Sequence, residues 1–273
     1  MIAFFLLSLY GRVIAFLPSW CSSLLCMLVA RVALMTSLRS RVERGMRQFH
    51  WTGNYDVEGL ARKHIRFLTD VFHKLLYLRY YPWPKHRVAE EVRYENEGYL
   101  KEALKGKRGV ILVSLHMGNF FWSITDLSAV YPINLVVRVE KNPRWEAIAR
   151  KMRENCQIKT INSEGAALKI MKKLKKGEIV VFVIDQYILP FFYGPDHPLR
   201  EIFPRLMQKS GAPVIPFYTL DDGSHILVRF LPPLKEISTA VLEDMVMQGV
   251  KERPHLWFWW RRLGKVNKNL QQA

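Results

Sequence analysis

Hydrophobic and polar positions follow two different spacings along the chain, and the change of spacing separates predicted helices from predicted strands. Between residues 56 and 81, apolar side chains recur every three or four positions and prolines follow, which predicts an amphipathic helix. Later apolar runs are short and rich in β-branched residues. They predict strands over residues 109–115, 133–139, 158–161, 178–184, 213–220 and 225–230. Helical spacing between them predicts helices over residues 119–129, 143–155, 164–175 and 199–210.

This alternation predicts the fold class. Strands that are apolar on both sides, separated by helices, are typical of a parallel sheet buried between two helical layers. We therefore expect an α/β fold with a mostly parallel central sheet covered by helices, preceded by an N-terminal membrane-anchor helix. Residues 221–223 (DDG) predict a hairpin turn, so the last two strands should be antiparallel. The predicted division is a membrane anchor over residues 1–35 and an α/β domain over residues 36–273.

The N-terminal region is predicted to meet a membrane because its only charges up to residue 35 are Arg12 and Arg31. The apolar stretch over residues 13–30 is close to the shortest length that crosses about 30 Å of hydrocarbon, and Pro18 interrupts it, so it could span the bilayer or lie in the interface. No basic segment precedes it, which disfavours a signal peptide. A buried helical hairpin is the alternative. Four arginines follow and favour a cytoplasmic location for the rest of the chain: Arg39, Arg41, Arg44 and Arg47.

Composition adds a strong positive charge. The chain has 41 Lys and Arg against 24 Asp and Glu, a formal net charge of +17, and 12% of its residues are aromatic. Such a chain suits an anionic membrane surface or an acidic partner. Nucleic acid is not expected as a partner, because no nucleic-acid-binding module is recognisable. Two basic clusters could dock an acidic carrier protein or an anionic lipid: Lys101, Lys105, Lys107 and Arg108, and Lys169, Lys172, Lys173, Lys175 and Lys176.

Other function classes are disfavoured by motifs that the sequence lacks. Three cysteines without a CxxC pair argue against a zinc site or a disulfide framework, so we expect no metal. The sequence contains no G-x-S-x-G nucleophile elbow, which disfavours an α/β-hydrolase, and no G-x-x-x-x-G-K-[ST] loop, so we expect no ATP.

Candidate chemistry lies where predicted strands end, because sites in open α/β sheets lie beyond the carboxyl ends of the strands. His116 follows the first predicted strand, Arg138 ends the second, and Asp185 with Gln186 follows the fourth. A histidine presented at such an edge can act as a general base. A structural histidine is the alternative interpretation.

An oxyanion formed at this site would need hydrogen-bond donors. Arg138 and the main-chain amides around Gly118 and Asn119, at the start of the next predicted helix, are the candidates. Gly118 would also let the main chain turn tightly after the histidine. We expect the substrate-binding set to include Gly118, Asn119, Arg138, Gln186, Arg261 and Arg262.

Six motifs, in this order and spacing, resemble the bacterial lipid A biosynthesis (lauroyl/myristoyl) acyltransferase family, within the wider glycerolipid acyltransferase superfamily. They are residues 114–119 (SLHMGN), 136–143 (VVRVEKNP), 178–186 (EIVVFVIDQ), 192–194 (FYG), 211–216 (GAPVIP) and 254–262 (PHLWFWWRR). The resemblance implies a membrane-anchored enzyme on the cytoplasmic face of the bacterial inner membrane. It would move a fatty acyl chain from an acyl carrier protein thioester, with no other cofactor, to a hydroxyl of a lipid acceptor, first of all a lipid A precursor.

The sequence departs from the family pattern after the histidine. Members carry an acidic residue five positions after it, where it can orient the imidazole, and this chain has Phe121 there. The loss of an orienting carboxylate can cost on the order of 10⁴ in rate. We expect Asp185 to take its place, with a carboxylate oxygen within about 3.2 Å of an imidazole nitrogen. Asp126 should point elsewhere. A loop-stabilising role is the alternative for Asp185.

A second departure lies near the C-terminus, where the family's Trp-x-His-Arg-Arg ending lacks its histidine. Arg261 and Arg262, beside the aromatic residues 257–260, are predicted to meet an anionic head group under an aromatic belt, or else to belong to a packed terminal segment. Two other functions stay open. One is acylation of another membrane aminolipid or glycolipid, and the other is a catalytically silent protein that binds lipid or carrier protein.

Overall fold

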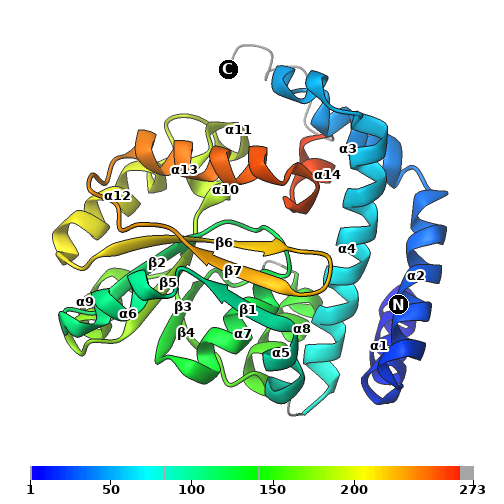
Figure 1. The fold of residues 1–273 in the computed structure, drawn as a ribbon, viewed down its shortest axis with the longest axis horizontal. Helices are drawn as coiled ribbons and strands as arrows, with labels where there is room; N and C mark the ends of the chain where they lie inside the picture. The colour runs from blue at the N-terminus through cyan, green and yellow to red at the C-terminus, as the bar shows by residue number, and fades with distance from the viewer. Residues whose placement is uncertain (1, 83, 141, 265–273) are drawn as a thin grey trace.

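The computed structural model describes residues 2–82, 84–140 and 142–264. Within these residues, a seven-stranded sheet in the order β1-β7-β6-β2-β5-β3-β4 forms the centre (Figure 1). Its strands are β1 (Val92–Glu95), β2 (Val110–Ser114), β3 (Ile133–Val137), β4 (Lys159–Asn162), β5 (Ile179–Val183), β6 (Val214–Asp221) and β7 (Ile226–Phe230). From β6 to β4 all neighbours are parallel, and β7 is antiparallel to β6. The predicted mostly parallel sheet and antiparallel last pair are confirmed.

Helices cover both faces of this sheet, as the strand pattern predicts. Side chains of β2 alternate between two hydrophobic clusters, with Val110 and Leu112 in one and Ile111 and Val113 in the other. The first cluster includes α5 (Lys85–Glu91), α6 (Gly98–Lys105), α7 (Phe120–Val130) and α8 (Pro143–Asn155). The second includes α9 (Ala166–Lys175), α10 (Asp185–Ile188), α12 (Leu199–Ser210), α13 (Thr239–Glu252) and α14 (Trp260–Leu263).

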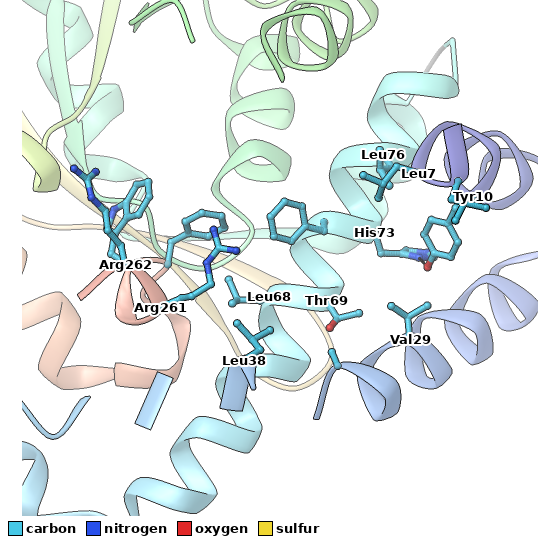
Figure 2. Close-up of a pocket in the computed structure, with 15 residues that line it drawn as sticks. Leu7, Tyr10, Val29, Leu38, Leu68, Thr69, His73, Leu76, Arg261 and Arg262 are labelled. Carbon is cyan, nitrogen blue, oxygen red and sulfur yellow. Dashed lines mark hydrogen bonds between the residues drawn. The ribbon is translucent and has the colours of Figure 1, made fainter. Parts of the chain in front are cut away.

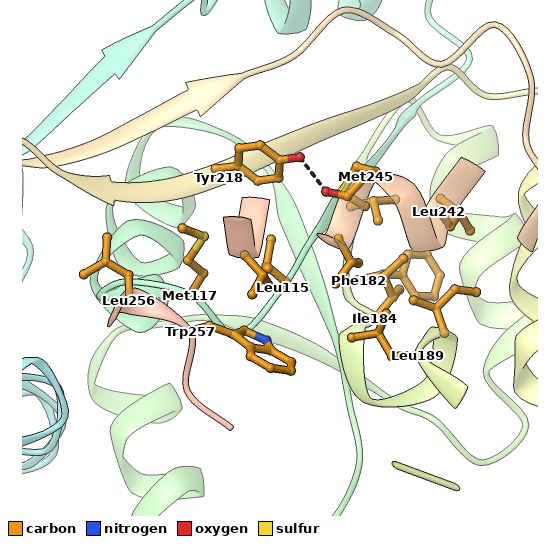
Figure 3. Packing of buried hydrophobic residues seen from close by; sticks show 14 of the residues in the cluster. Leu115, Met117, Phe182, Ile184, Leu189, Tyr218, Leu242, Met245, Leu256 and Trp257 are labelled. Carbon is orange, nitrogen blue, oxygen red and sulfur yellow. Dashed lines mark hydrogen bonds between the residues drawn. The ribbon is translucent and has the colours of Figure 1, made fainter. Parts of the chain in front are cut away.

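The second cluster packs directly beneath the strand ends where the chemistry is expected (Figure 3). Leu115, Met117 and Trp257 meet there, and each is fully buried. The Tyr218 hydroxyl donates to the carbonyl of Met245 at 2.6 Å, which ties β6 to α13. Because this layer is densely packed, the loops that leave β2 and β5 have a rigid base.

The N-terminal region corrects the prediction of a single anchor helix. It forms α1 (Ile2–Phe16), α2 (Ser19–Leu34) and α3 (Leu38–Met46). Pro18 has an extended backbone (φ −53°, ψ 147°) between α1 and α2 and cannot continue the first helix, so residues 13–30 are not one continuous segment. Among the described residues no single helix is long and apolar enough to cross a bilayer, and α2 and α3 reach that length only as a pair bent by 75°.

The helices α1 and α2 lie against α4 (Val57–Tyr80), the long helix that stands beside the sheet (Figure 1). His73 of α4 joins them, since its Nδ1 lies 2.7 Å from the Tyr10 hydroxyl and its Nε2 lies 2.8 Å from the Ser22 hydroxyl. The outer side chains are not covered, with Phe16 of α1 78% and Trp20 of α2 66% exposed. The alternative of a buried hairpin is therefore wrong for the residues whose side chains the structure describes.

The remaining short helices are η1 (His50–Asn54), α11 (Pro190–Tyr193) and η2 (Pro254–Leu256). The predicted domain limit at residue 273 includes residues 265–273, which lie outside the described residues.

Candidate active site

Sheet register brings His116 and Asp185 together. The adjacent parallel strands β2 and β5 pair Ser114 with Val183, and two residues further along each strand come His116 and Asp185. The main-chain N–H of Ile184 donates to the carbonyl of Ser114 at 3.0 Å and extends the pairing past the strands. The two side chains therefore leave the same edge of the sheet from neighbouring positions.

The carboxylate of Asp185 is fully buried and surrounded by donors. Its Oδ1 lies 2.6 Å from His116 Nδ1 and accepts from the main-chain N–H of Gln186 at 3.1 Å. Its Oδ2 accepts from the main-chain N–H of His116 at 3.1 Å and from the indole N–H groups of Trp257 and Trp259, both at 3.0 Å. The predicted contact between Asp185 and the imidazole is confirmed.

These contacts set the charge of the pair. Burial alone would raise the pKa of Asp185, but the charge and hydrogen bonds of His116 and the Trp257 indole outweigh it and lower this pKa below its usual value. Because an ionised carboxylate only accepts hydrogen bonds, His116 Nδ1 carries the proton that points to it. The other ring nitrogen, Nε2, makes no hydrogen bond to any described residue.

The imidazole stands at the edge of a pocket of about 570 Å³. Its side chain is 23% exposed, and the rings of Phe120 and Trp259 meet it edge-on at centroid distances of 5.0 and 4.9 Å. Phe121, at the position of the family's acid, also lines the pocket and stacks near Phe120, with centroids 4.1 Å apart. Apolar rings therefore exclude water from one side of the imidazole.

Three predicted binding residues share this pocket. Arg138, Gln186 and Arg262 line it together with His116. The Arg138 guanidinium lies 3.5 Å from the Tyr187 hydroxyl. Arg262 lies 5.2 Å from the ring centroid of Tyr193 and has two further aromatic neighbours. Arg153 lines the pocket as well, but its guanidinium pairs with Glu146 at 2.7 Å, so Arg138 and Arg262 are the arginines of the pocket without an acidic partner among the described residues.

Gly118 and Asn119 do not line this pocket, and the prediction for the Gly118 amide is wrong. The Gly118 N–H donates to the carbonyl of Leu256 at 2.9 Å, so it cannot also bind an oxyanion. The Asn119 side chain turns away and donates to Asp70 on α4 at 2.8 Å. Asp126 points elsewhere, as predicted, and accepts a hydrogen bond from Tyr94.

The C-terminal segment, residues 254–264, packs against the loop that carries His116. Phe258 donates to the carbonyl of His116 at 3.0 Å, and Met117 and Trp257 form a β-bridge. Trp257 and Trp260 are fully buried, so they form no aromatic belt at a membrane, and the packed-segment alternative holds for them. Sequence reasoning missed that Trp257 and Trp259 hold Asp185, because nothing in local spacing links residues more than seventy positions apart.

A second, largely apolar groove of about 590 Å³ lies between α1, α2, α4 and this segment (Figure 2). Leu7 and Val29 face it from the N-terminal helices and Leu68 and Leu76 from α4. Arg261 lines this groove only, whereas Arg262 and Trp259 line both the groove and the His116 pocket. The two hollows are therefore neighbours that share a wall.

Comparison with known proteins agrees with this geometry. Residues 1–265 match the family of bacterial lipid A biosynthesis acyltransferases. The chain belongs to this family. It is also similar to the lipid A biosynthesis lauroyltransferase of Escherichia coli (strain K12), with 24% identity over 213 residues, 67% of this chain and 65% of that protein. The matched part is thus just under two thirds of that relative's length.

Asp185 occupies the place of a carboxylate that the family pattern has elsewhere in the sequence. The acid that the family pattern expects after the histidine is an apolar ring here, at Phe121, and the carboxylate of Asp185, at the start of α10 after the adjacent strand β5, contacts the imidazole in its place. Among the described residues no three His, Cys, Asp or Glu side chains are grouped as metal ligands.

Proposed function

We propose that this protein is an O-acyltransferase that moves a fatty acyl chain from an acyl carrier protein thioester to a hydroxyl of a lipid A precursor. The observation that carries the proposal is the buried contact between Asp185 and His116 Nδ1, which leaves Nε2 free at the edge of a pocket. Membership of the lipid A acyltransferase family supports the choice of acceptor.

The free nitrogen of His116 supplies the base that this reaction needs, because an alcohol is a poor nucleophile until it loses its proton. Nε2 takes the proton of the acceptor hydroxyl while the oxygen attacks the thioester carbonyl carbon. The resulting imidazolium is stabilised by the ionised carboxylate of Asp185. The carbon–sulfur bond then breaks, the sulfur leaves as a thiolate, and it takes the proton from His116. The products are an ester and a free thiol.

The tetrahedral intermediate carries a negative charge on the former carbonyl oxygen. Arg138 is the proposed donor to this oxygen, because its guanidinium shares the pocket with His116 and carries a permanent charge. Arg262 is the other arginine of the pocket without an acidic partner among the described residues, and its aromatic neighbours restrict its position. We assign it to the binding of an anionic part of either substrate.

The apolar groove is the proposed site for hydrocarbon chains. It lies beside the His116 pocket and is lined mostly by aliphatic and aromatic side chains. Its walls include α1 and α2, whose outer residues Phe16 and Trp20 remain exposed. An apolar surface of this kind favours burial in the head-group region of a bilayer. We therefore propose that α1 and α2 hold the protein on the cytoplasmic face of the inner membrane.

The acyl donor, the carrier protein thioester, is proposed to enter through the His116 pocket. The basic cluster at the end of α9 precedes β5, and the cluster around Arg108 precedes β2, so both lie at the sheet edge opposite His116. About eight residues of extended chain, on the order of 25 Å, separate Arg108 from His116. A carrier protein bound at those clusters would have to deliver its thioester around the sheet, which favours docking near Arg138 and Arg262.

Assays of the purified full-length protein with acyl carrier protein thioester and a lipid A precursor test the proposal. His116→Ala and Asp185→Asn should each lower the rate of acyl transfer by at least about 10², and the double variant should be little worse than His116→Ala, because the two side chains act as one unit. Asp126→Asn is the matched control, a buried carboxylate bonded to Tyr94, and should retain the rate. Full activity of Asp185→Asn would contradict the proposal.

The silent lipid-binding alternative is favoured by one observation, the ring of Phe121 where the family carries an acid. Mass spectrometry of lipids from cells with and without the gene separates the two functions and also reports another acceptor, if the enzyme uses an aminolipid or glycolipid. A new acylated lipid that disappears in the His116→Ala strain supports transfer. An unchanged lipid profile supports the silent alternative.

A further inference from the structure

A second polar cavity of about 550 Å³ lies between α2, α4 and α5, away from His116. We call it the α2–α4 cavity. Its lining includes four basic side chains and two acidic ones. They are Arg31, Arg66, Lys74, Arg87, Asp70 and Glu91. His73 lines both this cavity and the apolar groove, so the two hollows adjoin.

The acids of the cavity are already satisfied by neighbours within the fold. Lys74 Nζ lies 3.5 Å from Asp70 and 3.0 Å from Glu91, and Arg87 lies 3.6 Å from the other oxygen of Glu91. Asp70 also accepts from the Asn119 side chain at 2.8 Å. Burial tends to lower the pKa of Lys74, but the two carboxylates outweigh it and raise this pKa, so the ammonium stays charged. Both carboxylates are therefore already paired with cations of the fold.

Arg31 and Arg66 are solvent-exposed residues that line the cavity, and neither makes an ion pair or hydrogen bond with another described residue. They enter the cavity from facing helices, Arg31 near the end of α2 and Arg66 from the middle of α4. With four Arg and Lys side chains against two Asp and Glu side chains in its lining, the cavity has an excess of positive charge that an anion would balance.

A buried donor gives independent support. Trp122 of α7 lines the cavity, is 1% exposed, and its indole N–H has no hydrogen-bond partner among the described residues. A buried donor without an acceptor costs free energy, and such groups in native folds commonly mark a missing ligand or ordered water. The acceptor that also matches Arg31 and Arg66 is an oxyanion.

We propose that the α2–α4 cavity binds an anionic phosphate group, carried by the head group of a membrane phospholipid. Phosphate oxygens accept hydrogen bonds from guanidinium and indole groups together, and its charge balances Arg31 and Arg66. The position favours a lipid, because α2 exposes Trp20, Leu24 and Leu28 on its surface and the adjoining apolar groove can receive a hydrocarbon chain. The site would fix α2 on α4 and thereby couple membrane binding to Asn119, three residues after His116.

Native mass spectrometry of the full-length protein released from detergent micelles tests this. Titration with dioleoyl phosphatidylglycerol should give one tightly retained lipid per chain, and dioleoylglycerol, which lacks the phosphate, should bind at least about ten-fold more weakly. Inorganic phosphate is added as a competitor. Displacement of the lipid means that the phosphate group alone is recognised, and retention means that the lipid as a whole is required.

Matched variants locate the binding. Arg31→Gln/Arg66→Gln should lose at least about ten-fold in phosphatidylglycerol affinity, and Trp122→Phe should lose affinity while the fold is kept, since only the N–H donor is removed. Arg62→Gln is the control, because Arg62 also lies on α4 but pairs with Glu58 outside the cavity. His116→Ala should bind like the wild type, which separates this site from acyl transfer. Equal binding of the two lipids, or an unchanged affinity of the double variant, would overturn the proposal.

Discussion

Asp185 is held in place by the side chains of Trp257 and Trp259, which lie more than seventy residues after it in the sequence. The indole N–H groups of Trp257 and Trp259 both donate to Oδ2, so the other oxygen stays directed at the His116 ring. A carboxylate that can rotate would orient the imidazole for only part of the time. We therefore regard Trp257 and Trp259 as positioning residues for the proposed base.

Trp259→Phe tests this positioning role, because Trp259 is partly exposed and phenylalanine keeps most of its packing. Loss of the N–H donor should lower kcat about ten-fold and leave the KM for the thioester nearly unchanged. Trp260→Phe is the matched control in the same segment, since its N–H donates to the carbonyl of Pro254 at 2.6 Å and not to Asp185. A kcat loss of equal size in both variants would mean that the segment acts only through stability.

The depressed pKa of Asp185 also predicts a pH dependence of stability. A carboxyl whose pKa is lower in the folded state stabilises the fold above its unfolded value, near about pH 4, and this contribution is lost as the pH falls through the folded pKa. Urea unfolding should show Asp185→Asn less stable than the wild type at pH 7. The difference in unfolding free energy between the wild type and Asp185→Asn should become smaller at acidic pH.

Asp126 is a control for this pH dependence, because its pKa is shifted in the opposite direction. Burial raises the pKa of Asp126, and the hydrogen bond from Tyr94 only partly offsets it. The wild type should therefore gain stability relative to Asp126→Asn as the pH falls. If the two variants changed in the same direction, the Asp185 carboxylate would not be stabilised in its charged form.

Among the elements, the turn between β2 and α7 sets the direction of the histidine. Gly118 has a φ of +57°, and a Cβ there would overlap the main-chain oxygen of Thr219 on β6. Gly118→Ala should lower the free energy of unfolding by roughly 2–4 kcal/mol, the sum of backbone strain and overlap. Gly165→Ala is the matched control, with φ +64° and open space around it, and should cost only about 1–2 kcal/mol. If chemical denaturation gave equal losses of unfolding free energy for the two variants, the structure would have shifted to remove the overlap with Thr219.

Much of the element order could be predicted from the sequence, because β5 is apolar throughout, β2 is apolar up to its last residue Ser114, and the helices between strands show regular spacing. The strand-end rule also predicted that Asp185 contacts His116, since adjacent parallel strands deliver their next residues to one edge. The strand β1 was missed because it has only four residues and a mixed polar pattern. The roles of Trp257 and Trp259 depend on tertiary packing and leave no periodic signal.

At the scale of the whole molecule, apolar and basic surfaces are separated. The exposed apolar residues of α1 and α2 lie beside α4, and the basic end of α9 lies across the sheet from them (Figure 1). A protein held on the bilayer through α1 and α2 therefore presents the α9 cluster away from that contact. The charge of this cluster then acts on soluble partners more than on anionic lipid.

Membrane retention tests the role of the N-terminal helices. Phe5→Ser, Phe16→Ser, Trp20→Ser and Leu28→Ser, combined, remove side chains that are between 55% and 78% exposed, so the fold should survive while the apolar surface is lost. Carbonate washing should release this variant from membranes and leave the wild type bound. Leu168→Ser, an exposed apolar position on α9, is the control and should behave like the wild type. Retention of the combined variant would contradict an anchoring role for α1 and α2.

The hydrogen bonds between Asp185 and the C-terminal tryptophans also bear on the order of events during synthesis. Chains emerge from the ribosome N-terminal end first, at about 5–20 residues per second, so α1 and α2 are exposed long before residues 254–264. Until that segment pairs with the His116 loop, the pairing of β2 with β5 can bring His116 and Asp185 together, but the two indole N–H donors to Asp185 are missing. An unfinished chain therefore holds the Asp185 carboxylate with two hydrogen bonds fewer than the complete chain, however early it reaches its site of action.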